Sequence, residues 1–267
     1  MVRLHAPAKL TLSLRITGLG DDGYHLIDAE MVSLSLHDVV TIDPTGDGIE
    51  ATGRFAAGVP TDDSNLVAKV LRLAQRSAHV TIDKRIPHGG GLGGGSSDAA
   101  TVLRWARWPT DPPGLEAAAR LGADIAFCLV GGHARVRGIG EVVDPLPHLD
   151  RSVTLVIPPL SVSTPAVYRA WDQLGGPTAA GPNDLEPAAI MVEPELARWR
   201  DLIGDACGST PILAGSGATW FVHGEHDNAL AALGNEGAEI IAARTIRASS
   251  EQNSVDEDGS SAVGQVD

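Results

Sequence analysis

The residues best suited to chemistry lie in a glycine-rich stretch, which reads Pro-His-Gly-Gly-Gly-Leu-Gly-Gly-Gly-Ser-Ser-Asp-Ala-Ala from Pro87 to Ala100. Without a Cβ atom, glycine adopts positive φ and lets a ligand approach the backbone closely. Successive N–H groups of such a loop can converge on phosphate oxygens. The stretch therefore predicts a phosphate-binding loop made of Gly89, Gly90, Gly91, Leu92, Gly93, Gly94 and Gly95.

The residues after this loop favour a helix over 97–108. Ser96, Ser97 and Asp98 are side chains that commonly cap a helix N-terminus, and the apolar residues that follow continue as helix. A helix that starts here would direct its unpaired N–H groups toward the bound phosphates. Ser96 and Ser97 are therefore further candidates for nucleotide contact, and either hydroxyl could contact a Mg²⁺ ion that accompanies the phosphates.

Other kinds of glycine-rich segment fit less well. Gly89, Gly91 and Gly94 match the dinucleotide fingerprint G-x-G-x-x-G, but that motif needs an acidic residue about 20 positions later at the end of a strand. Here that region reads Trp-Pro-Thr-Asp-Pro-Pro, which is typical of a loop. A Walker loop needs Gly-Lys-Ser/Thr, which the sequence lacks. A flexible linker remains as the structural alternative, although linkers seldom lead from a strand into a capped helix.

Pro87 to Ala99 also resembles the phosphate loop of the GHMP kinase superfamily, Pro-x-x-x-Gly-Leu-Gly-(small)-Ser-Ser-x-Ala. Several other segments resemble motifs of one branch of that superfamily, whose members phosphorylate 4-diphosphocytidyl-2-C-methyl-D-erythritol. In chain order these segments are Pro7-Ala8-Lys9-Leu10, Asp22-Gly23-Tyr24-His25-Leu26, Asn65-Leu66-Val67, Leu121-Gly122-Ala123-Asp124, Asn183-Asp184-Leu185-Glu186-Pro187 and Ala214-Gly215-Ser216-Gly217-Ala218-Thr219. The resemblance covers roughly residues 5 to 222.

The resemblance implies a fold and a reaction. The fold is α+β, the two-domain GHMP kinase fold with an N-terminal ribosomal-protein-S5-like domain and a C-terminal ferredoxin-like domain. The reaction is ATP-dependent phosphorylation of the 2-hydroxyl of the cytidine diphosphate derivative, a step in non-mevalonate isoprenoid precursor synthesis, with Mg²⁺ brought by ATP. The alternatives are another GHMP small-molecule kinase, acting on a sugar, homoserine or a mevalonate derivative, or a catalytically weakened homologue that binds nucleotide.

The resemblance also assigns roles to single residues. Asp124 would be the catalytic base, with Lys9 beside it. Tyr24 and Tyr168 would hold a cytosine between their rings, while His25 would contact the edge of the base. Asn65 would lie near the adenine or ribose of ATP. The structural alternatives are a turn or capping carboxylate for Asp124 and a solvated surface lysine for Lys9. For Tyr24 and His25 the alternative is a loop aromatic packed on the core, and for Asn65 it is an N-cap of the following helix.

Three positions depart from the pattern of this branch. Thr11 stands where an asparagine is usual, at a position expected near the substrate. Ala126 and Ala218 stand where proline is usual. Lys84, Arg85 and His88 flank the glycine stretch and are either phosphate contacts or solvated charges.

Strands and helices in two groups are expected to position these residues. Strict apolar alternation over 10–16 predicts a strand with one buried face, and further strands are expected at 29–36, 38–43, 79–86, 153–157, 219–223 and 239–246. Helices are expected at 65–76, 166–174, 194–203 and 227–233. The pattern divides the chain into an ATP-binding domain at 1–150, a second domain at 151–248 and an acidic disordered tail at 249–267.

Composition narrows the class of protein. The 267 residues carry a formal net charge of -14, which argues against a nucleic-acid-binding protein. Hydrophobic residues make up 43% of the chain, enough for a sizeable core, yet the sequence has neither a signal-peptide pattern at its N-terminus nor an apolar run of membrane-spanning length. Cys128 and Cys207 are expected to be free thiols, a single disulfide being the alternative. These features predict a cytoplasmic enzyme without a membrane partner.

Overall fold

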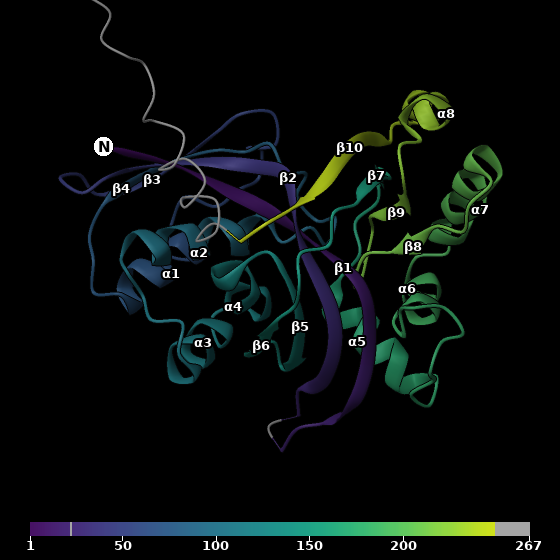
Figure 1. The fold of residues 1–267 in the computed structure, drawn as a ribbon, viewed down its shortest axis with the longest axis horizontal. Coiled ribbons are helices and arrows are strands. Elements are labelled where there is room, and N and C mark those ends of the chain that lie inside the picture. The colour runs from purple at the N-terminus through teal and green to yellow at the C-terminus, as the bar shows by residue number, and fades with distance from the viewer. Residues whose placement is uncertain (22, 249–267) are drawn as a thin grey trace, which may run out of the picture.

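The computed structural model describes residues 1–21 and 23–248, and the predicted acidic tail at 249–267 lies outside them. Strands and helices are mixed along the chain, so the predicted α+β class is confirmed (Figure 1). The strands are β1 (Val2–Leu19), β2 (His25–Asp43), β3 (Gly48–Thr52), β4 (His79–Asp83), β5 (His133–Gly138), β6 (Val142–Pro145), β7 (Ser152–Ile157), β8 (Ile212–Leu213), β9 (Trp220–His223) and β10 (Glu239–Ile246). The helices are α1 (Leu66–Leu73), α2 (Gly94–Trp105), α3 (Pro112–Ala119), α4 (Ala123–Val130), α5 (Thr164–Gln173), α6 (Glu186–Val192), α7 (Glu195–Cys207) and α8 (Asp227–Leu230), followed by the 3₁₀ helix η1 (Ala231–Glu236).

Strand β2 organises the first group of elements. One edge of β2 pairs with β1 along nearly the whole length of both strands. The other edge is shared, because β5 pairs with its first part, β10 with its middle and β4 with its last part. The predicted strands at 29–36 and 38–43 are therefore one long strand, and the sequence gives no breaking residue between them.

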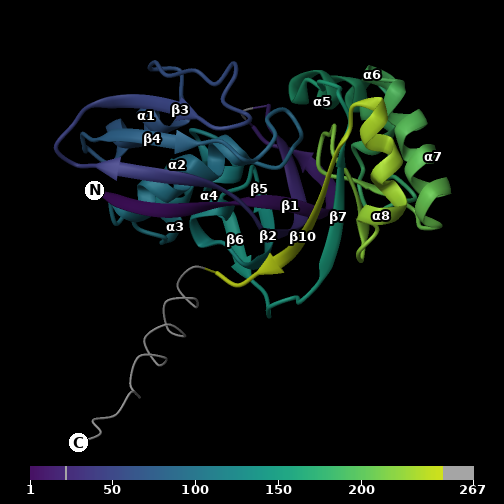
Figure 2. The same ribbon diagram turned by 90° about the horizontal axis from the view of Figure 1, so that it is seen from above.

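Strand β10 connects the two groups of elements. Residues Glu239–Arg244 pair with β7, which continues through β9 to β8, while Thr245 and Ile246 pair with β2. Figure 2 shows α1–α4 beside β1–β6, and α5–α8 beside β7 and β10 on the other side of the molecule. Position 150, where the sequence predicts a domain boundary, lies in the connection between β6 and β7; the boundary itself stays a prediction.

A small apolar cluster ties the two groups together beneath the glycine-rich loop. It contains residues from β1, β2, β7 and β9 as well as Leu92 from the loop itself. Its members are Ala8, Leu10, Val32, Leu34, Ile86, Leu92, Val153, Leu155, Ile157, Ala214, Phe221 and Ala243. Since Leu92 is only 1% exposed, its burial fixes the middle of the loop against the sheet.

The pairing of the alternating strand β1 with β2 is irregular at three places. The register shifts between Pro7 and Lys9, between Thr11 and Ser13, and between Ile16 and Gly18. Such irregularities re-aim side chains, and they commonly occur beside active sites. Ala8 and Leu10 consequently enter the small cluster, whereas Leu14 joins the main core. The expected single buried face is therefore wrong, because both sides of β1 are covered around Lys9 and Thr11.

Helix α2 begins earlier than the sequence predicts. Its N-cap is Gly93, in the left-handed conformation with φ 67°, and Gly94 is its first residue. Ser96, Ser97 and Asp98 therefore all lie inside the helix, and the prediction that these side chains cap it is wrong. Helix α4, which carries Asp124, was not predicted; it is short and mostly apolar, so it shows no amphipathic period. No helix in the described part of the chain is long and apolar enough to cross a membrane.

Candidate active site

The glycine-rich loop leads directly into the N-terminus of α2. The N–H groups of the first helical turn have no acceptor within a helix, so they remain available to an anion. Ser97 N–H donates to the Gly93 carbonyl at 2.8 Å, which closes the first turn. Gly93, Gly94, Gly95 and Ser96 therefore hold the backbone groups best suited to a phosphate. A shallow hollow of about 260 Å³ lies over them.

Several of these glycines are needed for packing as well as for a ligand. A Cβ atom on Gly90 would lie 2.6 Å from Thr219 Oγ1, and one on Gly91 would lie 2.7 Å from the Ala214 carbonyl oxygen. Both contacts come from the segment 214–219 that resembles the third superfamily motif. The glycine run thus brings two motifs into contact, an arrangement that phosphate binding alone would not predict.

Leu92 contributes to the loop through its backbone. Its side chain is buried in the small cluster, and its carbonyl accepts the Lys9 N–H at 2.9 Å. A Cβ atom on the next residue, Gly93, would lie 2.6 Å from Lys9 Cγ. The loop therefore positions Lys9 through two contacts. Because the Leu92 side chain is buried, only its backbone could contact the nucleotide, and this contact stays a prediction.

Lys9, Thr11 and Asp124 meet in a cavity of about 470 Å³ next to the loop. Lys9 Nζ lies 3.3 Å from Asp124 Oδ2 and donates to Thr11 Oγ1 at 3.2 Å. The Lys9 side chain is only 6% exposed, so it is not a solvated surface lysine, while the Asp124 side chain is 30% exposed toward the cavity. The α4 N-cap is Gly122, so Asp124 does not cap its helix. A carboxylate beside an ammonium in a cavity can orient a hydroxyl and accept its proton.

Aromatic residues line the same cavity. Tyr24, His25 and Tyr168 all contribute to its wall. The His25 and Tyr168 ring centroids lie 4.8 Å apart with the planes inclined by 32°, and Tyr24 is 64% exposed. Burial, reinforced by the negative charge of Asp124, raises the pKa of Tyr168 to about 12, so its hydroxyl stays protonated at neutral pH. The structure thus brings together residues that are about 140 positions apart in the chain.

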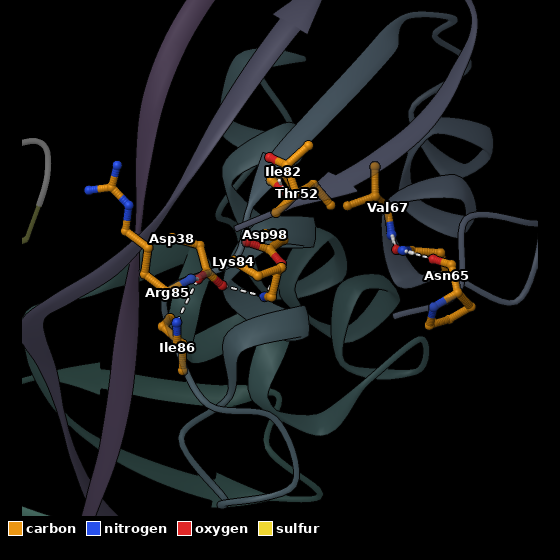
Figure 3. Close-up of polar contacts among 10 residues, drawn as sticks. Asp38, Thr52, Asn65, Val67, Ile82, Lys84, Arg85, Ile86 and Asp98 are labelled. Carbon is orange, nitrogen blue, oxygen red and sulfur yellow. Dashed lines mark hydrogen bonds and ion pairs between the residues drawn. The ribbon is translucent and has the colours of Figure 1, made fainter. Parts of the chain in front are cut away.

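A buried group of charges lies beneath the glycine loop (Figure 3). Lys84 Nζ donates to Asp98 Oδ2 at 2.7 Å and also to Asp38, whose other oxygen accepts the backbone N–H groups of Arg85 and Ile86. All three side chains are at most 4% exposed. Lys84 is therefore not solvated, unlike the exposed Arg85, which pairs with Asp83. Sequence reasoning missed Asp38, which lies 46 positions before its partner and in an unremarkable strand.

Asp98 carries an energetic cost in this group. Burial raises its pKa to about 7, and the nearby Asp38 carboxylate adds to the rise, although Lys84 opposes it. Burial also disfavours the charged Lys84, but the two carboxylates outweigh it, and the net effect raises the lysine pKa. The group therefore holds one ammonium, that of Lys84, between two carboxyls, and the Asp98 carboxyl takes up a proton near neutrality. Asp98 Oδ1 has no hydrogen-bond partner among the described residues.

We expect Asp98→Asn to flatten the pH dependence of stability. The native Asp98 carboxyl has a pKa of about 7, well above its ordinary value of 3.8, so the native state binds this proton more tightly than the unfolded state does. The resulting stability is present at low pH and is lost as the pH rises through 7. Between pH 5 and 8 the wild type should lose on the order of 2 kcal/mol that the variant keeps. Urea unfolding of both proteins at the two pH values measures this.

The matched control for this prediction is Asp205→Asn, which removes an exposed carboxyl from α7. It should follow the wild-type pH dependence. If Asp98→Asn also follows the wild type, Asp98 does not hold the proton.

Asn65 has the structural role that the sequence offered as an alternative. Its side chain caps α1 by accepting the Val67 N–H at 2.8 Å and donates to the Pro60 carbonyl at 2.6 Å (Figure 3). It is 8% exposed, next to Leu66 in the wall of the loop hollow. Contact with ATP stays a prediction for Asn65.

Asn183 and Asp184, from another of the motifs, stabilise the site without lining the cavity. Asn183 donates to the carbonyls of Leu213 and Gly215, and Asp184 accepts the Ile16 N–H at 3.0 Å. Both are buried, so this motif ties the second group of elements to β1 beside the cavity. Ala126 and Ala218, which replace the usual prolines, are fully buried, and Thr11 lies in the cavity as expected.

The described residues contain no group of three or more His, Cys, Asp or Glu side chains arranged to hold a metal ion. Ser97 Oγ is buried and has no hydrogen-bond partner in the described part of the chain. Ser96, and not Ser97, lines the loop hollow, so contact of either hydroxyl with a cation bound by phosphates stays a prediction. Cys128 and Cys207 are free, as expected.

Comparison with known proteins identifies relatives over most of the chain. Residues 65–132 match the family model described as GHMP kinases N terminal domain. The chain is 40% identical over 235 residues to 4-diphosphocytidyl-2-C-methyl-D-erythritol kinase of Paracoccus denitrificans (strain Pd 1222), covering 81% of this chain and 84% of that protein. The identically named protein of Paramagnetospirillum magneticum (strain ATCC 700264 / AMB-1) is 35% identical, with coverage of 88% and 93%. The crystal structure of a 4-(cytidine 5'-diphospho)-2C-methyl-D-erythritol kinase aligns with a TM-score of 0.74 and 32% identity, over 91% of this chain and 99% of that one.

Proposed function

The chain belongs to the 4-diphosphocytidyl-2-C-methyl-D-erythritol kinase family of GHMP kinases, and we propose that it phosphorylates the 2-hydroxyl of 4-diphosphocytidyl-2-C-methyl-D-erythritol. As a GHMP kinase, it is an ATP-dependent enzyme of isoprenoid precursor synthesis. The observation that best supports this substrate is one cavity lined both by the Lys9–Asp124 pair and by Tyr24, His25 and Tyr168.

Asp124 is the base in this proposal. Phosphoryl transfer depends on positioning and charge stabilisation more than on covalent chemistry. The Asp124 carboxylate would accept a hydrogen bond from the substrate hydroxyl and take its proton as the new bond forms. Lys9 Nζ, 3.3 Å from this carboxylate, would offset part of the negative charge on the phosphoryl oxygens. Thr11 Oγ1, at 3.2 Å from the same ammonium, would hold Lys9 in place and border the substrate.

ATP fits the glycine-rich hollow on physical grounds. The N–H groups at the start of α2 and the backbone of Gly89–Gly95 face a hollow that Lys84 and Ser96 also line. Bound ATP supplies the phosphoryl group. The accompanying Mg²⁺ would be held mainly by phosphates and water, with the hydroxyl of Ser96 or Ser97 as the protein candidate. A cytoplasmic location, where thiols such as Cys128 stay reduced, completes the proposal.

Transfer assays with defined acceptors test the proposal. ³¹P NMR should show ATP consumed and a phosphomonoester formed at the 2-hydroxyl of 4-diphosphocytidyl-2-C-methyl-D-erythritol. Homoserine, mevalonate and base-free methylerythritol phosphate, offered at the same concentration, should react far more slowly. Equal rates with the base-free compound would overturn the substrate assignment and favour another GHMP kinase activity. Nucleotide binding without transfer to any acceptor would indicate a weakened homologue.

The two tyrosines that line the cavity, Tyr24 and Tyr168, are the basis of a further prediction. Stacking a base on an aromatic ring contributes roughly 1–3 kcal/mol. Tyr168→Ala and Tyr24→Ala should therefore each raise the KM of the cytidine substrate about 5- to 150-fold. The KM of ATP should hardly change, because neither tyrosine lines the glycine-loop hollow. Steady-state kinetics with each substrate varied in turn give both constants.

Tyr168→Phe is the control for this prediction, since it keeps the ring and removes only a hydroxyl. It should retain most of the wild-type affinity. If both alanine variants bind the cytidine substrate as tightly as the wild type, the two rings do not hold the base.

A further inference from the structure

One face of α5 presents three side chains to His25, which lines the cavity. His25 Nε2 lies 2.8 Å from Asp172 Oδ1, and the ring also contacts Tyr168 and, edge-on at 5.6 Å, Trp171. Because Tyr168 and Asp172 are four residues apart on the helix, they point the same way. Figure 1 shows α5 beside the ends of β1 and β2, next to the turn from which His25 starts β2.

The contact with Asp172 determines where the His25 proton lies. An ionised carboxylate can only accept hydrogen bonds, so the imidazole nitrogen that faces it must carry the proton. In the neutral ring this places the proton on Nε2 and leaves a lone pair on Nδ1. The His25 side chain is 13% exposed, whereas the Asp172 side chain is 54% exposed. The imidazole is thus held in the cavity wall, with its protonation pattern set from the solvent side.

We propose that Asp172 is a positioning residue for substrate specificity, which keeps His25 in the Nε2–H form so that Nδ1 accepts a hydrogen bond from the base. This inference rests on the proposed function. Cytosine presents an amine, a donor, where uracil presents a carbonyl, an acceptor. A bare Nδ1 therefore pairs with the amine of cytosine and meets the carbonyl of uracil lone pair to lone pair. Stacking on tyrosine cannot make this distinction, because both bases have a π-face.

The Asp172 contact is therefore separable from stacking. Removing the carboxylate leaves Tyr168, Trp171 and the His25 ring present but frees the imidazole to carry its proton on either nitrogen. Nδ1–H would donate to the uracil carbonyl and oppose the cytosine amine. Asp172→Ala should thus reduce discrimination between the bases more than it reduces stacking affinity.

A spectroscopic experiment tests the tautomer directly. Two-dimensional ¹⁵N–¹H correlation of histidine-labelled full-length protein at pH 8, assigned with His25→Gln, distinguishes Nε2–H from Nδ1–H. We expect the Nε2–H pattern in the wild type and a shift toward Nδ1–H or a mixture in Asp172→Ala. Arg169→Ala, which changes an exposed charge on the same helix, should keep the wild-type pattern. An unchanged tautomer in Asp172→Ala would overturn the proposal whatever the enzyme phosphorylates.

Kinetics then test the consequence for specificity. The ratio of kcat/KM for the cytidine substrate to kcat/KM for its uridine analogue should fall about 5- to 10-fold in Asp172→Ala, which corresponds to losing one neutral hydrogen bond. The KM of ATP and the ratio in Arg169→Ala should stay at wild-type values. A wild-type ratio in Asp172→Ala would contradict the specificity role. Failure of the wild type to use the cytidine substrate would instead contradict the proposed function, and the tautomer measurement would still decide whether Asp172 orients His25.

Discussion

Replacing Asp124 by asparagine should lower kcat by roughly 10²–10⁴-fold, the usual loss when general-base assistance is removed. Asparagine keeps the size of the side chain and one hydrogen-bond acceptor, but it cannot take the proton of the attacking hydroxyl. The binding of ATP should change little, because the start of α2 and Lys84 line the neighbouring hollow, to which Asp124 does not contribute. Single-turnover phosphorylation and a calorimetric ATP titration measure the two quantities separately.

Asp111→Asn provides the matched control. Asp111 is also an aspartate at the start of a helix, but it caps α3 by accepting the Gly114 N–H at 3.0 Å. Asparagine caps a helix about as well, so this variant should keep wild-type turnover. Near-normal turnover in Asp124→Asn would remove Asp124 from the mechanism.

The Lys9–Asp124 contact allows a second test of this mechanism, with a double variant. Residues that act as a unit show strongly non-additive losses. Lys9→Met combined with Asp124→Asn should therefore lose scarcely more activity than the more damaged single variant. Losses that multiply would mean that the two side chains, although 3.3 Å apart, serve independent functions.

The sequence predicted the residues of this site better than the contacts between them. The glycine run was predicted from its own residue pattern, and Lys9, Asp124, Tyr24, His25 and Tyr168 from the resemblance to the family. The structure places all of them around two adjoining hollows. Local motifs succeed here because a backbone that approaches a phosphate, or a helix start that faces it, imposes residue types on consecutive positions.

The residues that the sequence did not predict depend on contacts between distant strands and helices. Asp38 meets Lys84 only because β2 pairs with β4, and Asp172 meets His25 only because α5 packs beside β2. An isolated aspartate in a strand or on an exposed helix face has no local signature. The bulges that turn Lys9 into the cavity are likewise set by pairing with β2 and not by the alternation of β1.

The glycines of the loop are required both for phosphate binding and for packing, and only the first requirement could be predicted from the sequence. Gly90 and Gly91 lie against Thr219 and Ala214, so their small size is required by another loop of the same chain. Gly89 differs, since a Cβ atom there would meet nothing within 4 Å. Since these glycines differ in what surrounds them, single substitutions along the loop can separate backbone conformation from packing.

Gly93→Ala should damage catalysis directly, because the added side chain would meet Lys9. The added Cβ atom would lie 2.6 Å from Lys9 Cγ, which is near the root of that side chain, so Lys9 must move away from Asp124. The φ of 67° adds strain of roughly 1–2 kcal/mol for an L-residue. We expect kcat to fall roughly 10²–10³-fold, as when one group that stabilises transition-state charge is lost, together with weaker ATP binding.

Gly89→Ala is the comparison that separates the two causes. Gly89 has a similar φ of 76° but an open surrounding, so alanine there has comparable backbone strain and no contact with Lys9. Its loss of kcat/KM should stay near tenfold, the equivalent of about 1.4 kcal/mol. Thermal unfolding of both variants, together with kcat and the ATP dissociation constant, makes the comparison complete. If the two variants lose the same kcat at equal stability, the loop binds nucleotide without positioning Lys9, and the contact between Gly93 and Lys9 has no catalytic consequence.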